Sequence, residues 1–231
     1  EVAFQAVDYI LRVLKKNMVF GMTWGRAMHE FVEQLAKDER LRSLSFQNVK
    51  VVPFLGTPGA IQSDSWNTTT YSNTLATKVG NLLHCASYNL SAPMYVEGTK
   101  EKELIESIDE IAKVLHMAET ADIALIGIGS MQDDSSIIKA EIRTREEYKE
   151  LVRKGAVGEI VGRIYDKNGQ TVDEDLKRKM VGISLDKIAK IPVRVGMSYG
   201  KDKIEAIKGA IAGGLVNVLV TDVPTAELLL K

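Results

Sequence analysis

Hydrophobic positions along the chain follow two alternating periods, one typical of amphipathic helices and one typical of buried strands. Apolar and β-branched runs predict strands at 18–22, 49–56, 91–97, 121–129, 193–200 and 216–222. Helical spacing of apolar residues predicts helices at 1–14, 26–37, 74–83, 101–118, 202–214 and 225–231. Because strands and helices alternate, the pattern favours a mostly parallel sheet that binds ligands at the carboxyl ends of its strands.

Two segments depart from this alternation. Residues 57–73 combine Gly and Pro with many hydroxyl side chains, which is typical of a loop. Residues 155–172 alternate apolar with small or polar residues and contain the turn sequence Asp-Lys-Asn-Gly at 166–169. We therefore expect an α/β fold with a central, mostly parallel sheet flanked by helices, and a smaller inserted subdomain over one edge.

Composition narrows the possible functions. The chain has 231 residues, 45% of them hydrophobic, which is enough for a full core. Its formal net charge of −1 argues against a segment that grips DNA unaided. The single cysteine, Cys85, excludes an internal disulfide and a zinc site built from several cysteines. Since no apolar run reaches membrane-spanning length and no signal peptide opens the chain, we expect a cytoplasmic protein without a membrane partner.

The turn from Thr23 through Gly25 and Arg26 to Ala27 follows the first predicted strand and opens a helix. The unpaired N–H groups and the dipole at a helix N-terminus favour a bound anion, and the Arg26 guanidinium could add further donors. The alternative is an ordinary turn between strand and helix with a surface arginine. The turn matches neither a Walker A loop nor a Gly-x-Gly-x-x-Gly fingerprint, so the pattern supports an anion site as a hypothesis.

Further candidate positions lie at the ends of other predicted elements. Gly127 and Gly129 close the strongest strand, where backbone without side chains can approach a ligand closely. Glu159 stands among small residues, where its carboxylate could accept hydrogen bonds from sugar hydroxyls or act as a base; a solvated glutamate is the alternative. Lys201 and Lys203 lie at a predicted helix N-terminus, where a nearby anion would offset their unfavourable position.

Metal binding and nucleophilic catalysis find no support in the sequence. The three histidines, His29, His84 and His116, lack the spacing of a metal-binding pair. Cys85 has no evident base partner, and a Gly-x-Ser-x-Gly motif does not occur. We therefore expect neither a metal nor a cofactor.

Six motifs occur in a fixed order: GMTWGRAM, VVPFLG, ADIALIGIG, GAVGEIVGRIYDKNG, GKDKIEAIKGAI and VNVLVTDVPTAELLL. From about residue 6 to its C-terminus, the chain resembles the effector-binding domain of the SorC family of bacterial sugar-responsive transcriptional regulators. The resemblance implies a domain similar to sugar-phosphate isomerases and glucosamine-6-phosphate deaminase. Such a domain binds a phosphorylated sugar and controls DNA affinity, commonly as a tetramer.

The resemblance also implies an N-terminal helix-turn-helix, whose pattern is not found in this sequence. Because the chain opens in a helical pattern without an initiator methionine, we expect it to start at a domain boundary. The residues that the resemblance implies for the effector are Gly25, Arg26 and Ala27 for the phosphate, Asn73 from the helix after the long loop, Glu159 for hydroxyls, and Lys203 for a charged or carbonyl end.

The sequence departs from the family pattern at two places. Relatives often have threonines where this chain has Arg26 and Ala27, and some have a basic residue where it has Leu55. Without that second cation, and with a lysine imine excluded at Leu55, we expect a monophosphorylated sugar or polyol and not a bisphosphate.

Two enzyme classes are the alternatives. An isomerase or deaminase on the same fold needs an acid/base pair at the substrate's C1–C2 edge, and Glu159 and Lys203 are the candidates. A nucleotide-dependent oxidoreductase needs a Gly-x-Gly-x-x-Gly fingerprint and an acidic residue on the next strand, and neither occurs. We predict instead a ligand-sensing domain that is not an enzyme, acts on operator DNA through the N-terminal domain, and forms a homodimer or tetramer.

Overall fold

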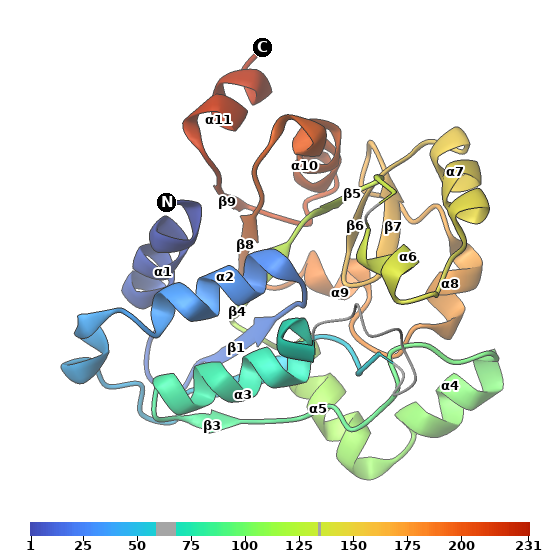
Figure 1. The fold of residues 1–231 in the computed structure, drawn as a ribbon. Coiled ribbons are helices and arrows are strands. Elements are labelled where there is room, and N and C mark those ends of the chain that lie inside the picture. Colours follow the sequence, from blue (N-terminus) through green and yellow to red (C-terminus); the bar gives the residue numbers. More distant parts are fainter. Residues whose placement is uncertain (59–67, 134) are drawn as a thin grey trace.

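The computed structural model describes residues 1–58, 68–133 and 135–231, and these form two sheets (Figure 1). The larger sheet is parallel, in the order β3-β2-β1-β4-β8-β9. Its strands are β1 (Val19–Met22), β2 (Lys50–Pro53), β3 (Ala86–Ser87), β4 (Ile123–Gly127), β8 (Val193–Met197) and β9 (Val218–Val220). The smaller, antiparallel sheet comprises β5 (Gly129–Ser130), β6 (Ala156–Ile160) and β7 (Arg163–Asp166).

Alternate residues of the parallel strands supply two separate parts of the core, because successive side chains of a strand point to opposite faces. One face packs against three helices, α1 (Val2–Val13), α2 (Arg26–Leu35) and α3 (Ser72–Leu82), with Phe20, Val51, Leu125 and Val195 among its buried residues. The other face contributes Val52, Ala124 and Ile126 to a second cluster, which extends into the smaller sheet. Burial on both faces explains why these strands are continuous apolar runs in the sequence.

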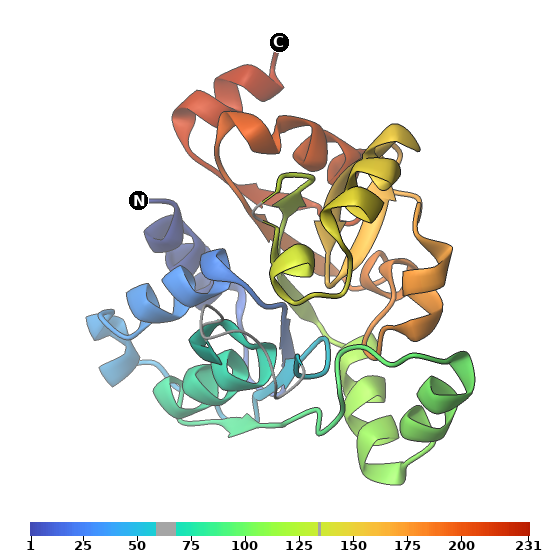
Figure 2. The same cartoon turned by 45° about the vertical axis from the view of Figure 1, so that its right-hand side comes forward.

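The remaining helices complete the layers around the two sheets. They are α4 (Thr99–Glu106), α5 (Asp109–Glu119), α6 (Ser136–Lys139), α7 (Arg145–Arg153), α8 (Glu174–Lys179), α9 (Leu185–Ile188), α10 (Ile204–Ala212) and α11 (Val223–Leu229). Seen from two sides, α6 and α7 lie with the β6–β7 hairpin in a second lobe (Figures 1 and 2). The chain between β4 and β8 builds this lobe, which confirms the expected α/β fold with an inserted subdomain.

Two predicted elements are wrong. The strand predicted at 91–97 is replaced by isolated bridges, from Pro93 to Thr57 and from Tyr95 to Met180. Proline has no N–H group to donate to a ladder, which disfavours a regular strand there. The helix predicted at 101–118 is broken into α4 and α5, where the Ser107 hydroxyl donates to the Leu104 carbonyl at 2.7 Å. Such side-chain bonds compete with the helical pattern, and an acidic first turn in α5 favours a new helix start.

The strand predicted at 121–129 contains a change of sheet. It leaves the parallel sheet after Gly127, and its last residues join the antiparallel sheet as β5. The predicted turn at 166–169 is present, since the Gly169 N–H donates to the Asp166 carbonyl at 2.9 Å. The middle of the loop predicted at 57–73 lies outside the described residues, and the two-residue strand β3 has no counterpart in the prediction.

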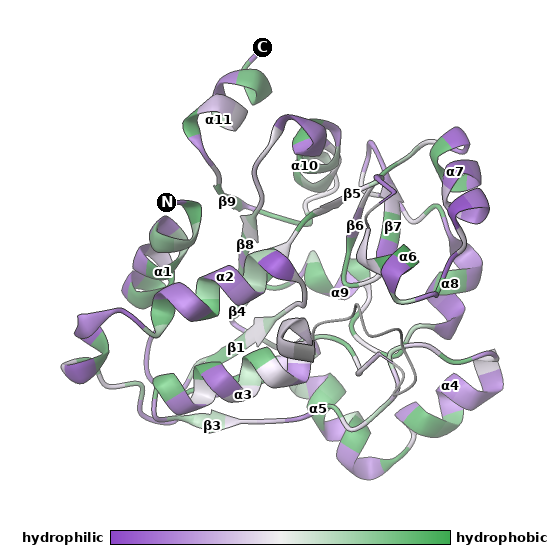
Figure 3. Cartoon of the chain, in the orientation of Figure 1, coloured by the Kyte–Doolittle hydropathy of each residue, from purple (hydrophilic) through white to green (hydrophobic). Residues whose placement is uncertain are grey.

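The helices that cover the sheets have one polar and one apolar side. Hydrophilic and hydrophobic stripes alternate along α2 and α7 (Figure 3). In the three described ranges, no helix has both the length and the apolar character that crossing a membrane requires. Within the same ranges, no cluster of three or more His, Cys, Asp or Glu residues is arranged to hold a metal ion.

Candidate functional site

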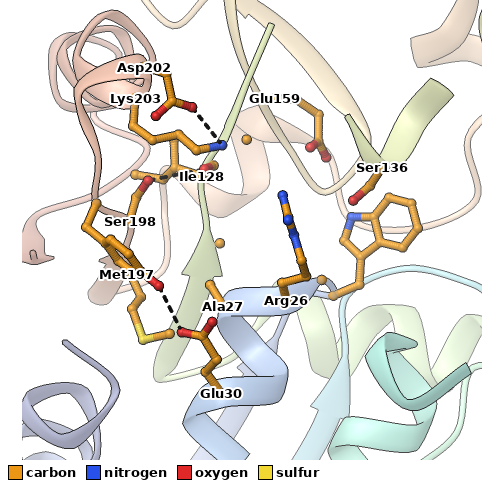
Figure 4. A pocket seen from close by; sticks show the side chains of 15 residues that line it. Arg26, Ala27, Glu30, Ile128, Ser136, Glu159, Met197, Ser198, Asp202 and Lys203 are labelled. Atoms are coloured by element: carbon orange, nitrogen blue, oxygen red, sulfur yellow. Dashed lines mark hydrogen bonds and ion pairs between the residues drawn. The ribbon is translucent and has the colours of Figure 1, made fainter. Parts of the chain in front are cut away.

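A cavity of about 340 Å³ lies where the carboxyl ends of β1, β4 and β8 meet the smaller sheet (Figure 4). Its lining residues come from distant parts of the sequence: Trp24, Gly25, Arg26, Ala27, Glu30, Gly127, Ile128, Gly129, Ser136, Glu159, Met197, Ser198, Tyr199, Asp202 and Lys203. From β1 the sheet grows in two directions: β2 and β3 lie on one side of it, and β4, β8 and β9 lie on the other. The cavity therefore occupies the switch point at which open α/β sheets bind ligands.

The first wall is the start of α2. Gly25 precedes this helix with a φ of 104°, and its N–H donates to the Thr70 carbonyl at 3.0 Å. A Cβ at Gly25 would meet no atom within 4 Å, so the backbone conformation and not lack of space requires glycine here. Because glycine cannot cap a helix with a side chain, the first N–H groups of α2 stand at the cavity wall without such a cap.

Arg26 supplies a positive charge at this wall. Its side chain is exposed and points into the cavity, so that the ends of Arg26, Lys203 and Glu159 converge (Figure 4). Ala27 adds backbone and a small side chain, which leaves room beside the helix terminus. An anion bound here would meet both the helix dipole and a guanidinium.

Thr23 shapes the cavity from behind its wall. The side chain is buried, and its Oγ1 accepts a hydrogen bond from the Gly127 N–H at 2.9 Å. This bond ties the end of β1 to the end of β4. A Cβ at Gly127 would lie 3.4 Å from the Trp24 carbonyl oxygen, an ordinary contact distance, so lack of space does not require glycine at this position. Thr23 is thus a neighbour of the cavity lining and not part of it.

Glu159 forms the opposite wall from strand β6. It is 7% exposed, and its Oε1 accepts a hydrogen bond of 2.7 Å from the Gly162 N–H. Burial raises the pKa of Glu159, while bonds from Gly162 and the Trp24 side chain and the charge of Lys203 oppose that rise. A Cβ on Gly129, its partner across the sheet, would lie 2.5 Å from Oε2, so the carboxylate needs a glycine there.

Lys203 closes the third wall, after β8. The chain turns at Gly200, with a φ of 112°, into the short helical turn Lys201–Lys203 that leads into α10. The Lys203 Nζ lies 4.0 Å from the Asp202 carboxylate, which also accepts a hydrogen bond from the Ser130 hydroxyl at 3.2 Å. Of the two lysines singled out in the sequence, Lys203 lines the cavity and Lys201 is exposed outside its lining.

Asn73 lies on α3, outside the residues that line the cavity. Its amide nitrogen donates to Thr57 Oγ1 at 2.8 Å and to the Leu90 carbonyl at 3.0 Å. Its amide oxygen accepts from the Leu90 N–H at 2.9 Å. These bonds hold two loops together, and a contact of Asn73 with an effector stays a prediction.

Sequence reasoning missed several lining residues, including Glu30, Tyr199 and Asp202. The Tyr199 hydroxyl donates to Glu30 Oε2 at 3.2 Å and links α2 to the connection after β8. Glu30 lies one helical turn after Arg26 on the same side of α2, so the helical period was a usable signal for it. Tyr199 and Asp202 lie on either side of Gly200; Asp202 belongs to the motif GKDKIEAIKGAI, in which only the lysines were singled out.

Residues 1–231 match a family model described as "Putative sugar-binding domain". The Klebsiella pneumoniae "Sorbitol operon regulator" is 30% identical over 222 residues, which are 95% of this chain and 67% of that protein. Transcriptional regulator LsrR of Escherichia coli is 30% identical over 230 residues, covering 98% of this chain and 67% of LsrR. The chain thus spans about two thirds of the length of these curated relatives.

Solved structures agree with these matches. Full-length SorC from Klebsiella pneumoniae superimposes with a TM-score of 0.88 at 28% identity, over 100% of this chain and 72% of that one. The probable sor operon regulator from Shigella flexneri gives 0.86 at 26% identity, over 100% and 87% of the two chains. The sequence motifs, the fold and these relatives agree, and the chain belongs to the SorC family of transcriptional regulators, of which it comprises the sugar-binding domain.

Proposed function

We propose that the cavity binds a phosphorylated sugar or polyol as the effector of a transcriptional regulator. The observation that carries this proposal is the pairing of the α2 N-terminus at Gly25–Ala27, where the N-cap glycine makes no side-chain cap, with the buried carboxyl group of Glu159 across the cavity. A helix N-terminus suits a phosphate, and carboxylate oxygens accept hydrogen bonds from hydroxyl groups. The matched family description and the relative named for sorbitol support a sugar-like ligand.

The charges around the cavity favour one phosphate on the effector. Arg26 and Lys203 are its cations, and Glu30, Glu159 and Asp202 are its carboxyl groups. Two phosphates would bring their negative charges against Glu30 and Asp202, which disfavours a bisphosphate. A monophosphate can use the α2 terminus and present hydroxyl donors to the carboxylates.

We propose that binding, without turnover, is the output of this domain, because its relatives are named as transcriptional regulators. In the full-length protein, an N-terminal helix-turn-helix would contact operator DNA. An effector that binds one quaternary arrangement of a homodimer or tetramer more tightly would shift the population of DNA-binding states.

A thermal-shift screen against hexose 6-phosphates and hexitol 6-phosphates tests the proposed ligand class. A matching effector at about one hundred times its Kd should stabilise the domain by about 2.7 kcal/mol. The same sugars and hexitols without phosphate are the control, and we expect them to shift the unfolding temperature little. Stabilisation by the unphosphorylated compounds alone would contradict the phosphate part of the proposal.

The 231-residue chain by itself is expected to bind DNA no better than background, because its net charge of −1 provides no basic excess. A gel-shift assay with operator fragments, at several salt concentrations, measures this. Sequence-specific retardation by this chain would contradict the assignment of DNA binding to another segment.

A further inference from the structure

Arg163 is a buried cation that lies outside the cavity lining. The residue opens β7 and is 3% exposed. Its Nη2 donates to two backbone carbonyls, of Met180 at 3.2 Å and of Gly182 at 3.1 Å. Its Nε and Nη1 have no hydrogen-bond partner within the described ranges, and burial lowers its pKa to about 10. Burying a charge with so few hydrogen bonds lowers the stability of the folded state. The two bonds that Arg163 does make are therefore of interest for what they hold in place.

The two carbonyls belong to a segment that is fixed to the parallel sheet. The Ile183 N–H donates to the Phe54 carbonyl at 2.8 Å, and the Gly56 N–H donates to the Val181 carbonyl at 3.1 Å. The Phe54 carbonyl and the Gly56 N–H both belong to the three residues that follow β2. Arg163 therefore connects the β6–β7 hairpin to the carboxyl end of the large sheet, across the boundary between the two lobes.

The turn next to Arg163 also holds Glu159. The hairpin closes through Val161 and Gly162, with φ of 54° and 68°, and Ile160 pairs with Arg163 on either side of it. These angles fit a tight two-residue hairpin turn. The Gly162 N–H of this turn donates the 2.7 Å bond to Glu159 Oε1. The turn lies close to the anchored segment, since a Cβ on Gly162 would overlap the Met180 Cε.

We propose that Arg163 is a positioning residue for Glu159: it fixes the β6–β7 turn against the large sheet and thereby holds the Glu159 carboxyl group in the cavity. The role of Glu159 in binding hydroxyls rests on the proposed function. The placement of Glu159 by Arg163 can be measured in the free protein. Arg163 acts here through the backbone of the hairpin and does not touch the effector.

The test is the titration of the Glu159 carboxyl carbon by NMR in ¹³C-glutamate-labelled full chain, with Glu159→Gln to assign the signal. In Arg163→Met we expect the pKa of Glu159 to fall toward that of an exposed glutamate, because a loosened turn admits water to the carboxylate. Burial is the largest influence on this pKa, so its loss should outweigh the opposite effect of a weaker Gly162 bond. The sign separates this effect from direct electrostatics, since removing a nearby cation would raise a carboxyl pKa. Exchange of the Gly162 amide proton should become faster in the same variant.

Arg143→Met is the matched control. Arg143 is also buried in the second lobe, but its Nε and Nη2 bond the Asp173 carboxylate at 2.8 and 3.0 Å. Its loss should destabilise the protein and leave the Glu159 titration unchanged. Arg163→Lys keeps the charge on a shorter side chain and should give an intermediate pKa. A parent-like Glu159 titration in Arg163→Met, or in Arg163→Lys where the methionine variant does not fold, overturns the proposal.

Inorganic phosphate separates this inference from the proposed function. Its binding, followed at the Ala27 amide, should stay within about twofold of the parent in Arg163→Met, because the α2 terminus is a separate wall. Equal loss of phosphate binding and of the Glu159 environment would show a general collapse of the cavity and overturn the positioning role. Absence of any phosphate effect in the parent would contradict the proposed phosphate site, while the Glu159 titration would still decide the role of Arg163.

Discussion

Replacing Arg26 with alanine is expected to weaken binding of a sugar monophosphate by roughly 1.5–3 kcal/mol, about tenfold to more than a hundredfold in Kd. The guanidinium points into the cavity beside the start of α2, where charge-assisted hydrogen bonds to a phosphate are strong (Figure 4). The side chain is exposed in the free protein, so its removal should leave the free energy of unfolding nearly unchanged. Isothermal titration calorimetry with the effector found in the thermal screen measures the loss.

Arg178→Ala provides the control for charge alone. Arg178 is likewise exposed but lies on α8, away from the cavity lining, and its removal should leave the affinity almost unchanged. A small loss in Arg26→Ala would mean that the α2 amides provide most of the phosphate binding. Parent-like affinity would place the phosphate elsewhere. Gly25 is less suitable for this test, because its φ of 104° would strain any other residue whether or not phosphate binds.

Glu159→Gln is expected to change stability and binding in opposite directions. Burial raises the pKa of Glu159 above its ordinary value, so the ionised carboxylate destabilises the folded state at neutral pH. Glutamine removes the buried charge and keeps an oxygen for the 2.7 Å bond from Gly162, although its NH2 group cannot accept the bond from Trp24. Because burial is the largest influence on the pKa of Glu159, the variant should still be more stable near pH 7. Loss of the carboxylate acceptor should weaken binding of a sugar phosphate by about 1.5–3 kcal/mol.

The pH dependence of the free energy of unfolding tests whether the pKa of Glu159 is raised. With a raised pKa, the folded state holds the proton more tightly than the unfolded state, so stability falls as pH rises between the unfolded and folded pKa values. The advantage of Glu159→Gln should therefore disappear at pH values below the pKa of an unfolded glutamate. Denaturant titrations of both proteins at acidic and neutral pH measure the difference. A variant that is less stable than the parent at neutral pH would contradict the assignment of a raised pKa.

The sequence was sufficient to predict the longer strands of the parallel sheet and the edge at which the cavity lies, because both depend on local patterns. Strands such as β4 are buried on both faces and read as continuous apolar runs, and glycines mark the turns where backbone must adopt a positive φ. Gly25 is such a turn glycine, whereas Gly127 and Gly129 were predicted from their place at the end of the strongest strand, and all three line the cavity. The alternation of apolar with small or polar residues at 155–172 also distinguished the hairpin that contains Glu159 from the helical segments.

What the sequence did not predict depends on one local side-chain bond and on contacts between distant residues. The break between α4 and α5 follows from a local bond of Ser107, within a segment whose apolar spacing continues across it. The Tyr199–Glu30 bond joins residues on different elements, so no local pattern predicts the bond, although the helical period places Glu30 on the same side of α2 as Arg26. Arg163 reads as one polar position in a strand, and its burial against Met180 and Gly182 appears only once the lobes are assembled.

The order of the parallel strands has a consequence for how the domain folds. β1 pairs with β4 about one hundred residues later, and β4 then needs β8, a further seventy residues along the chain. Such pairings close large loops before they gain stabilising contacts, so we expect folding on the slow side for a domain of this size. During synthesis, β4 would present an apolar, unpaired edge until β8 emerges from the ribosome. We expect this chain to be most prone to aggregation during that interval.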